Sequence, residues 1–310
     1  MKGILFKPNM QADDSETKDG EAKSNTPMYP DYRNQCVFHA CFASGKTFQA
    51  IVEYMFIVHE TLVFEVSSKG LTMKGDDRPT NSDNPAIKES MFTDFHIPPT
   101  GFINWYYGVE DEDCVTPVPV SAAAFHESLK GSILVKESLI LYILLLNVDF
   151  LYSRVVTGEG TNFKVDSSTK LLNTDALPDR FLQPMKTPFY DLTKPVVTFK
   201  TASLTGVCKD VKASKINEIS IDFHVAGIMM HFGSSTGGRK YPMGVVNSAA
   251  KPVYTAIFKV KKRFETLAKL NGLCKHVSVF ASRGKPVLFS FNINETGGFL
   301  NIYMVPEMEK

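Results

Sequence analysis

The feature that most constrains this chain is a short helical pattern between strand-like runs, and it occurs in both halves of the sequence. In the first half it lies between VFHACFA (37–43) and TLVFEVS (61–67), and in the second between VVTFKTA (196–202) and EISIDFH (218–224). Apolar residues spaced three and four apart predict a helix with one buried side. They are Phe48, Ile51, Val52 and Met55 in the first half and Leu204, Val207, Cys208 and Val211 in the second. Such units predict an α+β fold in which short strands alternate with a few helices.

Two more helices of this kind are expected, at 121–131 and at 259–271. Strands follow the first of them at 133–146, 149–156 and 162–172. In the second half, strands are expected at 228–233 and 253–260 and in three closing runs, HVSVFAS, PVLFSFNI and FLNIYMV. The β-α-β-β plan therefore appears twice in each half, which predicts two tandem domains.

Composition divides the chain into four parts. Residues 1–34 are charged and polar without an apolar period, and such a segment buries too little surface to offset its ordering entropy, so it is expected to be a disordered tail. Residues 35–170 and 196–310 carry the repeated plan and are the two expected domains. Residues 171–195 contain four prolines and break the periodicity, which predicts an interdomain connecting loop.

The sequence predicts no membrane segment. The most apolar run, Leu139–Val148, is about half of the roughly 20 residues that a spanning helix needs, and it ends at Asp149, so a buried strand is expected. The start of the chain lacks the basic and then apolar pattern of a signal peptide. The five cysteines are odd in number and form no CxxC pair, which favours reduced thiols in an intracellular compartment.

The candidate catalytic motifs are weak. The seven histidines form no HExxH motif and no zinc spacing with cysteines. The run GSSTGGRK (233–240) lacks the order of a phosphate-binding loop and predicts a hairpin turn. The acidic run Glu110–Asp113 follows Trp105–Gly108 and predicts a solvated loop rather than a cation site. The sequence therefore predicts that the protein is not an enzyme and has no catalytic residue, metal or cofactor.

Several segments resemble, in order, the DNA sliding clamps of the proliferating cell nuclear antigen family. Residues 37–71 are similar to the first strand, helix and strand of that family. Residues 170–175 resemble the entry to its interdomain connecting loop, and residues 207–211 resemble its third helix. Residues 285–306 resemble its last two strands, so the likeness extends over residues 36–307. Divergence from cellular clamps and the polar tail suggest a large DNA virus or an unusual eukaryote.

The resemblance implies two clamp domains whose helices line the hole of a homotrimeric ring around double-stranded DNA. Enclosure would hold the ring on DNA while its contacts with phosphates stay weak enough to allow sliding. Such a clamp is a DNA polymerase processivity factor that also tethers other clamp-binding proteins, in the nucleus or in a viral DNA replication compartment. Subunits would join at the edges near 162–172 and 241–248.

Two other interpretations stay open. One is a clamp-fold processivity factor that is monomeric or dimeric and does not encircle DNA, like those of herpesviruses. The other is an enzyme that acts on DNA. The mass in solution separates the first from a ring, and an assay for hydrolysis or transfer with added metal tests the second.

If helices line a hole around DNA, the side opposite each apolar stripe should carry basic residues. The formal net charge is only +1, so DNA binding requires a local arrangement of charge. The second half fits, whereas the first-half helices present residues such as Gln49, Glu53 and Glu127. The second half is therefore predicted to make most of the phosphate contacts, and the alternative is an ordinary solvated face. The candidates are Lys209, Lys212, Lys215, Lys259, Lys261, Lys262 and Lys269.

The resemblance also implies an apolar site for the aromatic residues of a partner peptide, between the connecting loop and the last strand. A pocket with apolar anchors and a polar rim is a reasonable binding hot spot. Asp76 stands where the family usually has a methionine, so the partner motif is expected to differ. The alternative is that Tyr303 and Met304 belong to the strand core. The matching positions are Leu182, Pro184, Met185, Pro286, Tyr303, Val305 and Pro306.

Overall fold

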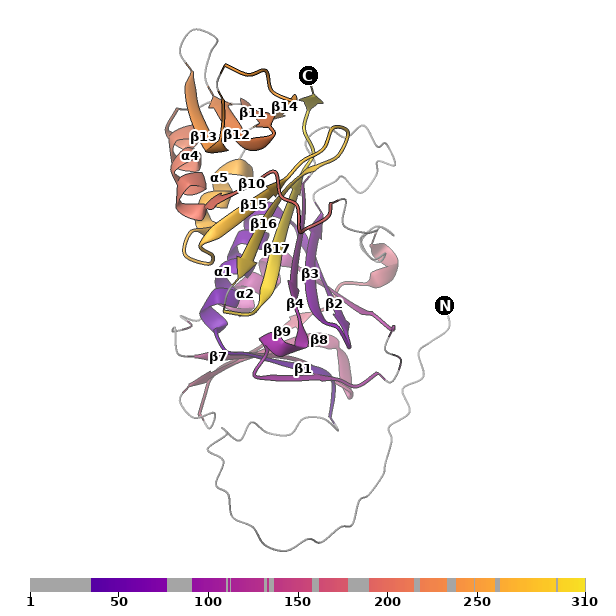
Figure 1. Cartoon of the computed structure of the whole chain (residues 1–310). Helices are drawn as coiled ribbons and strands as arrows, with labels where there is room; N and C mark the ends of the chain where they lie inside the picture. Colours follow the sequence, from indigo (N-terminus) through magenta and orange to yellow (C-terminus); the bar gives the residue numbers. More distant parts are fainter. Residues whose placement is uncertain are drawn as a thin grey trace, which may run out of the picture.

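The fold is taken from a computed structural model of the chain (Figure 1). It describes residues 35–76, 91–109, 111, 113–130, 133, 137–157, 162–177, 190–214, 218–232, 238–247, 249–259, 263–293 and 295–309. The expected disordered tail at 1–34 therefore lies outside the described residues.

The described chain is built of four units with the order strand, helix, strand, strand, strand. The first is β1 (Cys36–Phe42), α1 (Gly45–Val58), β2 (Thr61–Ser67), β3 (Gly70–Asp76) and β4 (Met91–Ile97). The second is β6 (Thr116–Ser121), α2 (Ala122–Ser128), β7 (Ser138–Leu144), β8 (Asn147–Thr157) and β9 (Asn162–Lys170). The third is β10 (Val197–Lys200), α4 (Thr201–Ser214), β11 (Glu218–His224), β12 (Ala226–Phe232) and β13 (Arg239–Val245). The fourth is β14 (Tyr254–Lys259), α5 (Arg263–Thr266) with η3 (Leu267–Leu270), β15 (His276–Phe280), β16 (Val287–Ile293) and β17 (Gly298–Met304).

Short elements outside this plan are η1 (Pro99–Gly101), β5 (Asn104–Tyr107), η2 (Thr174–Ala176) and β18 (Met308–Glu309).

The strands form three antiparallel sheets. One sheet, in the order β5-β1-β7-β8-β9, comes from the first half, and another, in the order β13-β12-β11-β14-β18, comes from the second. The third, β10-β15-β16-β17-β4-β3-β2-β6, contains strands of both halves. The halves join within it where β17 pairs with β4, with Leu300 opposite Phe95. Strands far apart in sequence thus form one continuous sheet.

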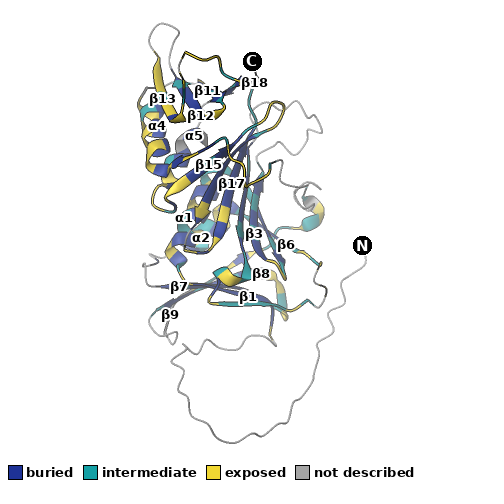
Figure 2. Cartoon of the chain, viewed as in Figure 1, coloured by how far each residue is buried: buried dark blue, intermediate teal, exposed yellow. Residues whose placement is uncertain are grey.

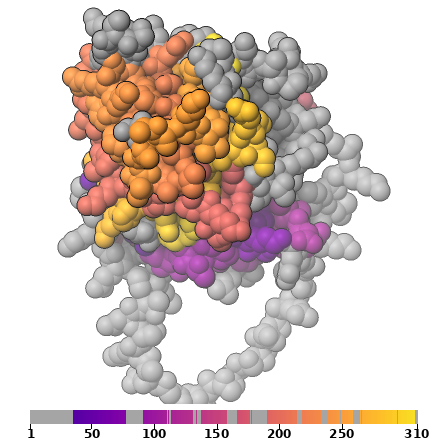
Figure 3. All heavy atoms as spheres, turned by 45° about the horizontal axis from the view of Figure 1, so that its top comes forward, coloured from indigo at the N-terminus to yellow at the C-terminus, as the bar shows by residue number. Residues whose placement is uncertain are grey.

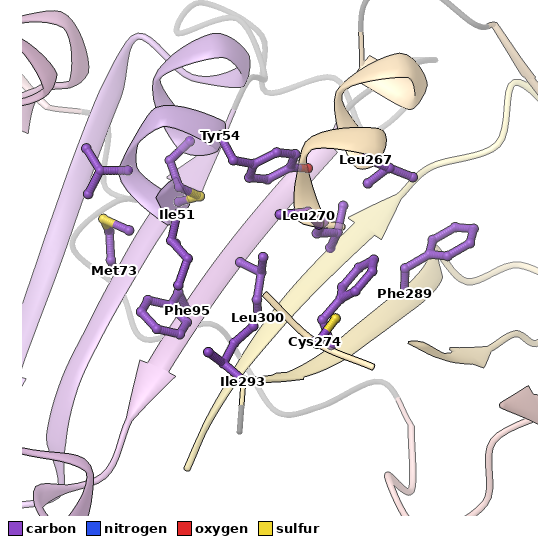
Figure 4. Packing of buried hydrophobic residues seen from close by; sticks show 14 of the residues in the cluster. Ile51, Tyr54, Met73, Phe95, Leu267, Leu270, Cys274, Phe289, Ile293 and Leu300 are labelled. Carbon is purple, nitrogen blue, oxygen red and sulfur yellow. The ribbon is translucent and has the colours of Figure 1, made fainter. Parts of the chain in front are cut away.

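The helices lie together on one side of this shared sheet (Figure 1). α1 contacts α2 and also α5 and η3, and α4 contacts α5 and η3. Each buries its apolar side, and Figure 4 shows Ile51 and Tyr54 of α1 with Leu267 and Leu270 of η3 above the strands. Most of the buried apolar residues of both halves belong to one cluster, so the helix layer and the shared sheet are a single packed unit.

Capping follows from the sequence at both first-half helices. The Ser44 hydroxyl accepts a hydrogen bond from the Thr47 amide at 3.3 Å, and the Ser121 hydroxyl accepts one from the Ala124 amide at 3.4 Å. Such caps satisfy amides that the first turn of a helix leaves without partners. The helices therefore begin where a serine ends the preceding strand or turn.

Some expectations are corrected. The apolar run Leu139–Val148 is not one buried strand: β7 ends at Leu144, and the side chain of Leu146 in the following turn is 100% exposed. Trp105, for which the sequence predicts no strand, lies in β5 and pairs with Ala40. The helix expected at 259–271 is shorter, because Lys259 still pairs with Glu218 as the last residue of β14.

Candidate nucleic-acid interface

The exposed side of α4 carries two lysines. Leu204, Val207, Cys208 and Val211 are all buried, as the helical spacing predicts. Lys209 and Lys212 are exposed on the other side of the helix. No ion pair is found for either lysine among the described residues. Both side chains are therefore open to solvent, which is the arrangement needed to contact phosphates.

The other lysines predicted to bind DNA are not equivalent to these two. Lys269 is exposed, but its Nζ is 2.7 Å from Oε1 of Glu53 on α1. Lys259 ends β14, and nothing is described of its side chain. The remaining three, Lys215, Lys261 and Lys262, lie outside the described residues.

The first-half helices present a surface with less free positive charge. Glu127 of α2 forms an ion pair with Lys130, and Glu53 holds Lys269. Between them the ring of Phe56 stacks on that of His126, with centroids 4.5 Å apart and planes 5° apart. This surface combines paired charges with a half-exposed aromatic pair, as expected from a sequence that places few lysines here.

Sequence reasoning missed Arg239, which the structure brings to α4. It was assigned to a hairpin turn with GSSTGG, but it is the first residue of β13. Its Nη1 atom is 3.4 Å from Oδ2 of Asp210 on α4, and Tyr241 also donates a hydrogen bond to that carboxylate. The alternation Arg239, Tyr241, Met243 was the available signal, because it places these three side chains on one face of a strand.

A row of mainly apolar side chains crosses the opposite face of the shared sheet. Residues directly opposite in antiparallel strands point to the same face. Phe280, Leu288 and Tyr303 form a separate buried cluster, with Phe92 and Tyr190 packed against it. The pairing continues the row from β15 to β3 as Phe280, Leu288, Tyr303, Phe92 and Asp76. Asp76 thus ends the apolar row, and it is the position at which the sequence predicts an altered partner site.

The partner-site residues are brought together in part. The hydroxyl of Tyr190 donates a hydrogen bond to the carbonyl oxygen of Pro286 at 2.6 Å, and its ring is 6.1 Å from that of Phe280. Tyr303 lies in this outer cluster, whereas Met304 belongs to the main core. Val305 and Pro306 are half-buried just beyond β17, and Leu182, Pro184 and Met185 lie outside the described residues.

A polar row lies beside the apolar one. The amide of Asn301 donates to Oδ1 of Asp94 at 2.9 Å and accepts from the Ser290 hydroxyl at 2.7 Å. Burial raises the pKa of the Asp94 carboxyl to about 6, the charge of Glu65 adds to this, and the Asn301 hydrogen bond and the charge of Lys74 oppose it. The network joins β4 to β17, so a titratable group is buried where the halves meet.

No group of three or more residues that could hold a metal ion is found in the described part of the chain. None of the described helices is long and apolar enough to cross a membrane. Residues 233–237, for which a hairpin turn is expected, and two of the acidic residues, Glu110 and Glu112, lie outside that part.

Comparison with known proteins identifies the fold. No protein-family model matches the chain, and no curated protein matches its sequence. Among solved structures, the proliferating cellular nuclear antigen of Entamoeba histolytica is similar, with a TM-score of 0.66 and 17% identity over 88% of this chain and 100% of that one. The PCNA2-PCNA3 complex of Sulfolobus tokodaii is also similar, with a TM-score of 0.63 and 16% identity over 86% of this chain and 98% of the matched chain. The chain therefore has the α+β fold of the PCNA-type clamp, which confirms the predicted fold class.

Proposed function

We propose that this protein is a non-enzymatic DNA sliding clamp that encircles duplex DNA and acts as a polymerase processivity factor. The observation that carries the proposal is the layer of helices on one side of the shared sheet, with Lys209 and Lys212 exposed on its surface and without an ion pair among the described residues. Contacts of lysines with phosphates are independent of base sequence and sensitive to salt. In this proposal the second half makes most of them, and Lys215, Lys259, Lys261 and Lys262 add to the same surface.

Two edge strands support ring closure by a second and third copy of the chain. In the described topology β9 pairs only with β8, and β13 pairs only with β12. An unpaired strand edge presents amide and carbonyl groups to any strand that approaches it. We propose that β9 of one subunit pairs with β13 of the next, which gives a head-to-tail homotrimer.

The face away from the helices is the proposed partner site. The row from Phe280 to Phe92 supplies an apolar centre, and Asp76 supplies an acidic end. DNA polymerase and other clamp-binding proteins would bind here through an aromatic segment. With DNA and its polymerases as partners, the protein would act in the nucleus or in a viral DNA replication compartment.

The test is retention on DNA of defined topology. A duplex fixed to a surface at one end is incubated with the protein, and the free end is then blocked with a bulky protein or left open. A ring remains on the blocked duplex in a high-salt wash and leaves the open one. Solution mass is measured in parallel, and a ring requires about three times the chain mass of 34.5 kDa. Equal loss from both duplexes would contradict encirclement.

One observation favours the second candidate, a clamp-fold factor that is monomeric or dimeric and does not encircle DNA. Both glutamates on the first-half helices hold lysines in ion pairs, so the free positive charge is concentrated in one half. A surface with this asymmetry also suits a protein that touches DNA from one side. A strict monomer or dimer that still increases processivity would establish this alternative.

A further inference from the structure

Arg239 belongs to the helix side of the second-half sheet. In β12 and β13, Phe232 lies opposite Arg239 and Met230 lies opposite Tyr241. Phe232 and Met230 are buried in the main core, so their partners point toward the same side. The ring of Tyr241 stacks on that of Phe232, with centroids 5.0 Å apart. Arg239 therefore faces the layer that contains α4, whereas its neighbour Lys240 points to the opposite face.

Asp210 holds Arg239 against one side of α4. The Arg239 guanidinium lies 3.4 Å from the Asp210 carboxylate, which also accepts the hydrogen bond from the Tyr241 hydroxyl. With about 3.6 residues per turn, Asp210 lies about 100° around α4 from Lys209 and about 160° from Lys212, so Arg239 is nearer to the side that carries Lys209. The Arg239 side chain is nevertheless 66% exposed. Its contact with Asp210 fixes its position without removing it from solvent.

The charge at this place stays positive. Among the described residues, α4 and the first residue of β13 together carry three basic side chains, Lys209, Lys212 and Arg239, and one acidic side chain, Asp210. The undescribed segments that border the site, 215–217 and 233–237, contain a single charged residue, Lys215, which is basic. In Figure 2 exposed residues occur on both α4 and β13, and in Figure 3 the segments from α4 to β14, salmon to orange, form one continuous part of the surface.

We propose that Arg239 is a further phosphate-binding residue of the DNA interface, with Asp210 and Tyr241 as its positioning residues. This inference rests on the proposed function. A guanidinium has five donors in a fixed plane, so an arginine held by one carboxylate keeps donors for a phosphate. Prior fixing by Asp210 lowers the side-chain entropy lost on binding. The basic surface thus extends from α4 onto β13, the strand that the proposed ring pairs with β9 of the next subunit, so Arg239 would lie where two subunits meet on the helix side.

The experiment measures binding of the full chain to a short fluorescent duplex by anisotropy over a series of KCl concentrations. Arg239→Ala is compared with Lys240→Ala, which removes the same charge from the adjacent residue on the other face. Each Arg239 that contacts a phosphate contributes about 0.9 to the slope of log K against log[salt], so Arg239→Ala lowers the slope by at least that amount. Arg239→Lys should leave the slope unchanged, because the positive charge is kept. Tyr241→Phe should weaken binding at every salt concentration but leave the slope unchanged, because it removes a positioning contact and no charge. Thermal unfolding and solution mass are measured for each variant to establish that fold and assembly are intact.

Two kinds of failure are distinct. If the unchanged protein shows no salt-dependent binding to duplex DNA, the proposed function itself is wrong. If it binds, but Arg239→Ala retains the full slope or Lys240→Ala lowers it equally, the role of Arg239 is wrong and the proposed function stands.

Discussion

The helix surfaces of the two halves differ in charge, although the same structural unit builds both. In the first half, Glu53 and Glu127 each hold a lysine, and an aromatic pair lies between them. In the second half, Lys209 and Lys212 of α4 are exposed without an ion pair among the described residues. The buried sides of the helices are alike, because packing on a sheet requires an apolar stripe. The exposed sides are not constrained by packing, so a difference in charge between them can reflect a difference in the proposed DNA contact.

The largest expected effect comes from reversing the charge of α4. Lys209→Glu/Lys212→Glu removes two phosphate contacts and adds two repulsive charges, so duplex affinity should fall by about a hundredfold or more, which corresponds to ~3 kcal/mol. Anisotropy with a short duplex at fixed salt measures this loss. The matched control is Lys46→Glu/Lys130→Glu, which makes the same change in the first half, on α1 and just beyond the end of α2. An equal loss in both variants would mean that the halves do not differ in DNA contact.

A substitution of Asp94 tests stability without touching the proposed DNA contact. Asp94 is buried where the two halves join, on the face of the sheet opposite the helices. Its folded-state pKa is raised to about 6, so the folded protein binds this proton more tightly than the unfolded chain does. Stability from this group is therefore present at low pH and is lost as the pH rises through about 6. Asp94→Asn should raise the free energy of unfolding by about 2–3 kcal/mol at pH 8, since one pKa unit corresponds to ~1.4 kcal/mol.

Denaturant titration at pH 4 and pH 8 measures this effect. The gain should be present at pH 8 and nearly absent at pH 4, and duplex affinity should not change. Asn301→Ala is the complementary variant, because it leaves Asp94 buried without its hydrogen-bond donor and should lower stability. A gain of the same size at both pH values would show that ionisation of Asp94 is not its cause.

A smaller effect is expected from neutralising the first-half glutamates. Glu53→Gln/Glu127→Gln removes two negative charges and releases Lys269 and Lys130 from their ion pairs. Duplex affinity should increase by about tenfold, or ~1.4 kcal/mol, and the salt dependence should become steeper. Stability should change little, because exposed ion pairs contribute about 0–1 kcal/mol. Unchanged affinity would place the first-half surface away from DNA.

The sequence predicts best the strands and helices whose apolar residues recur at regular spacing. The expected strands at 61–67 and 218–224 coincide with β2 and β11. The sequence does not predict β4, because Thr93, Asp94 and His96 interrupt its apolar residues, and Asp94 is buried with Asn301, which is 207 positions away. In the first and third units the fourth strand, β4 or β13, does not follow from the sequence, and in both units an undescribed segment separates it from the preceding strand.

The candidate interface could be predicted only in part, for a related reason. Helical spacing identifies the exposed side of α4, so Lys209 and Lys212 follow from the sequence. Whether a lysine is free depends on contacts between distant segments, such as the pair of Lys269 with Glu53 across 216 positions. Arg239 was missed because glycines before it suggested a turn, and the pairing of β13 with β12 decides which face it occupies.

The smallest expected effect concerns the face opposite the helices. There Tyr190, near the end of the connecting segment, donates a hydrogen bond to Pro286 in the turn between β15 and β16. Tyr190→Phe removes the hydrogen bond to Pro286 but keeps the ring against Phe280. The free energy of unfolding should fall by about 1 kcal/mol, which is typical of one hydrogen bond. Thermal unfolding measures this loss, and Tyr190→Ala should cost more because the outer apolar cluster loses its cover. Neither variant should alter the salt dependence of duplex binding, since this site and the helix layer lie on opposite faces of the sheet. A change in that dependence would show that the two faces are coupled.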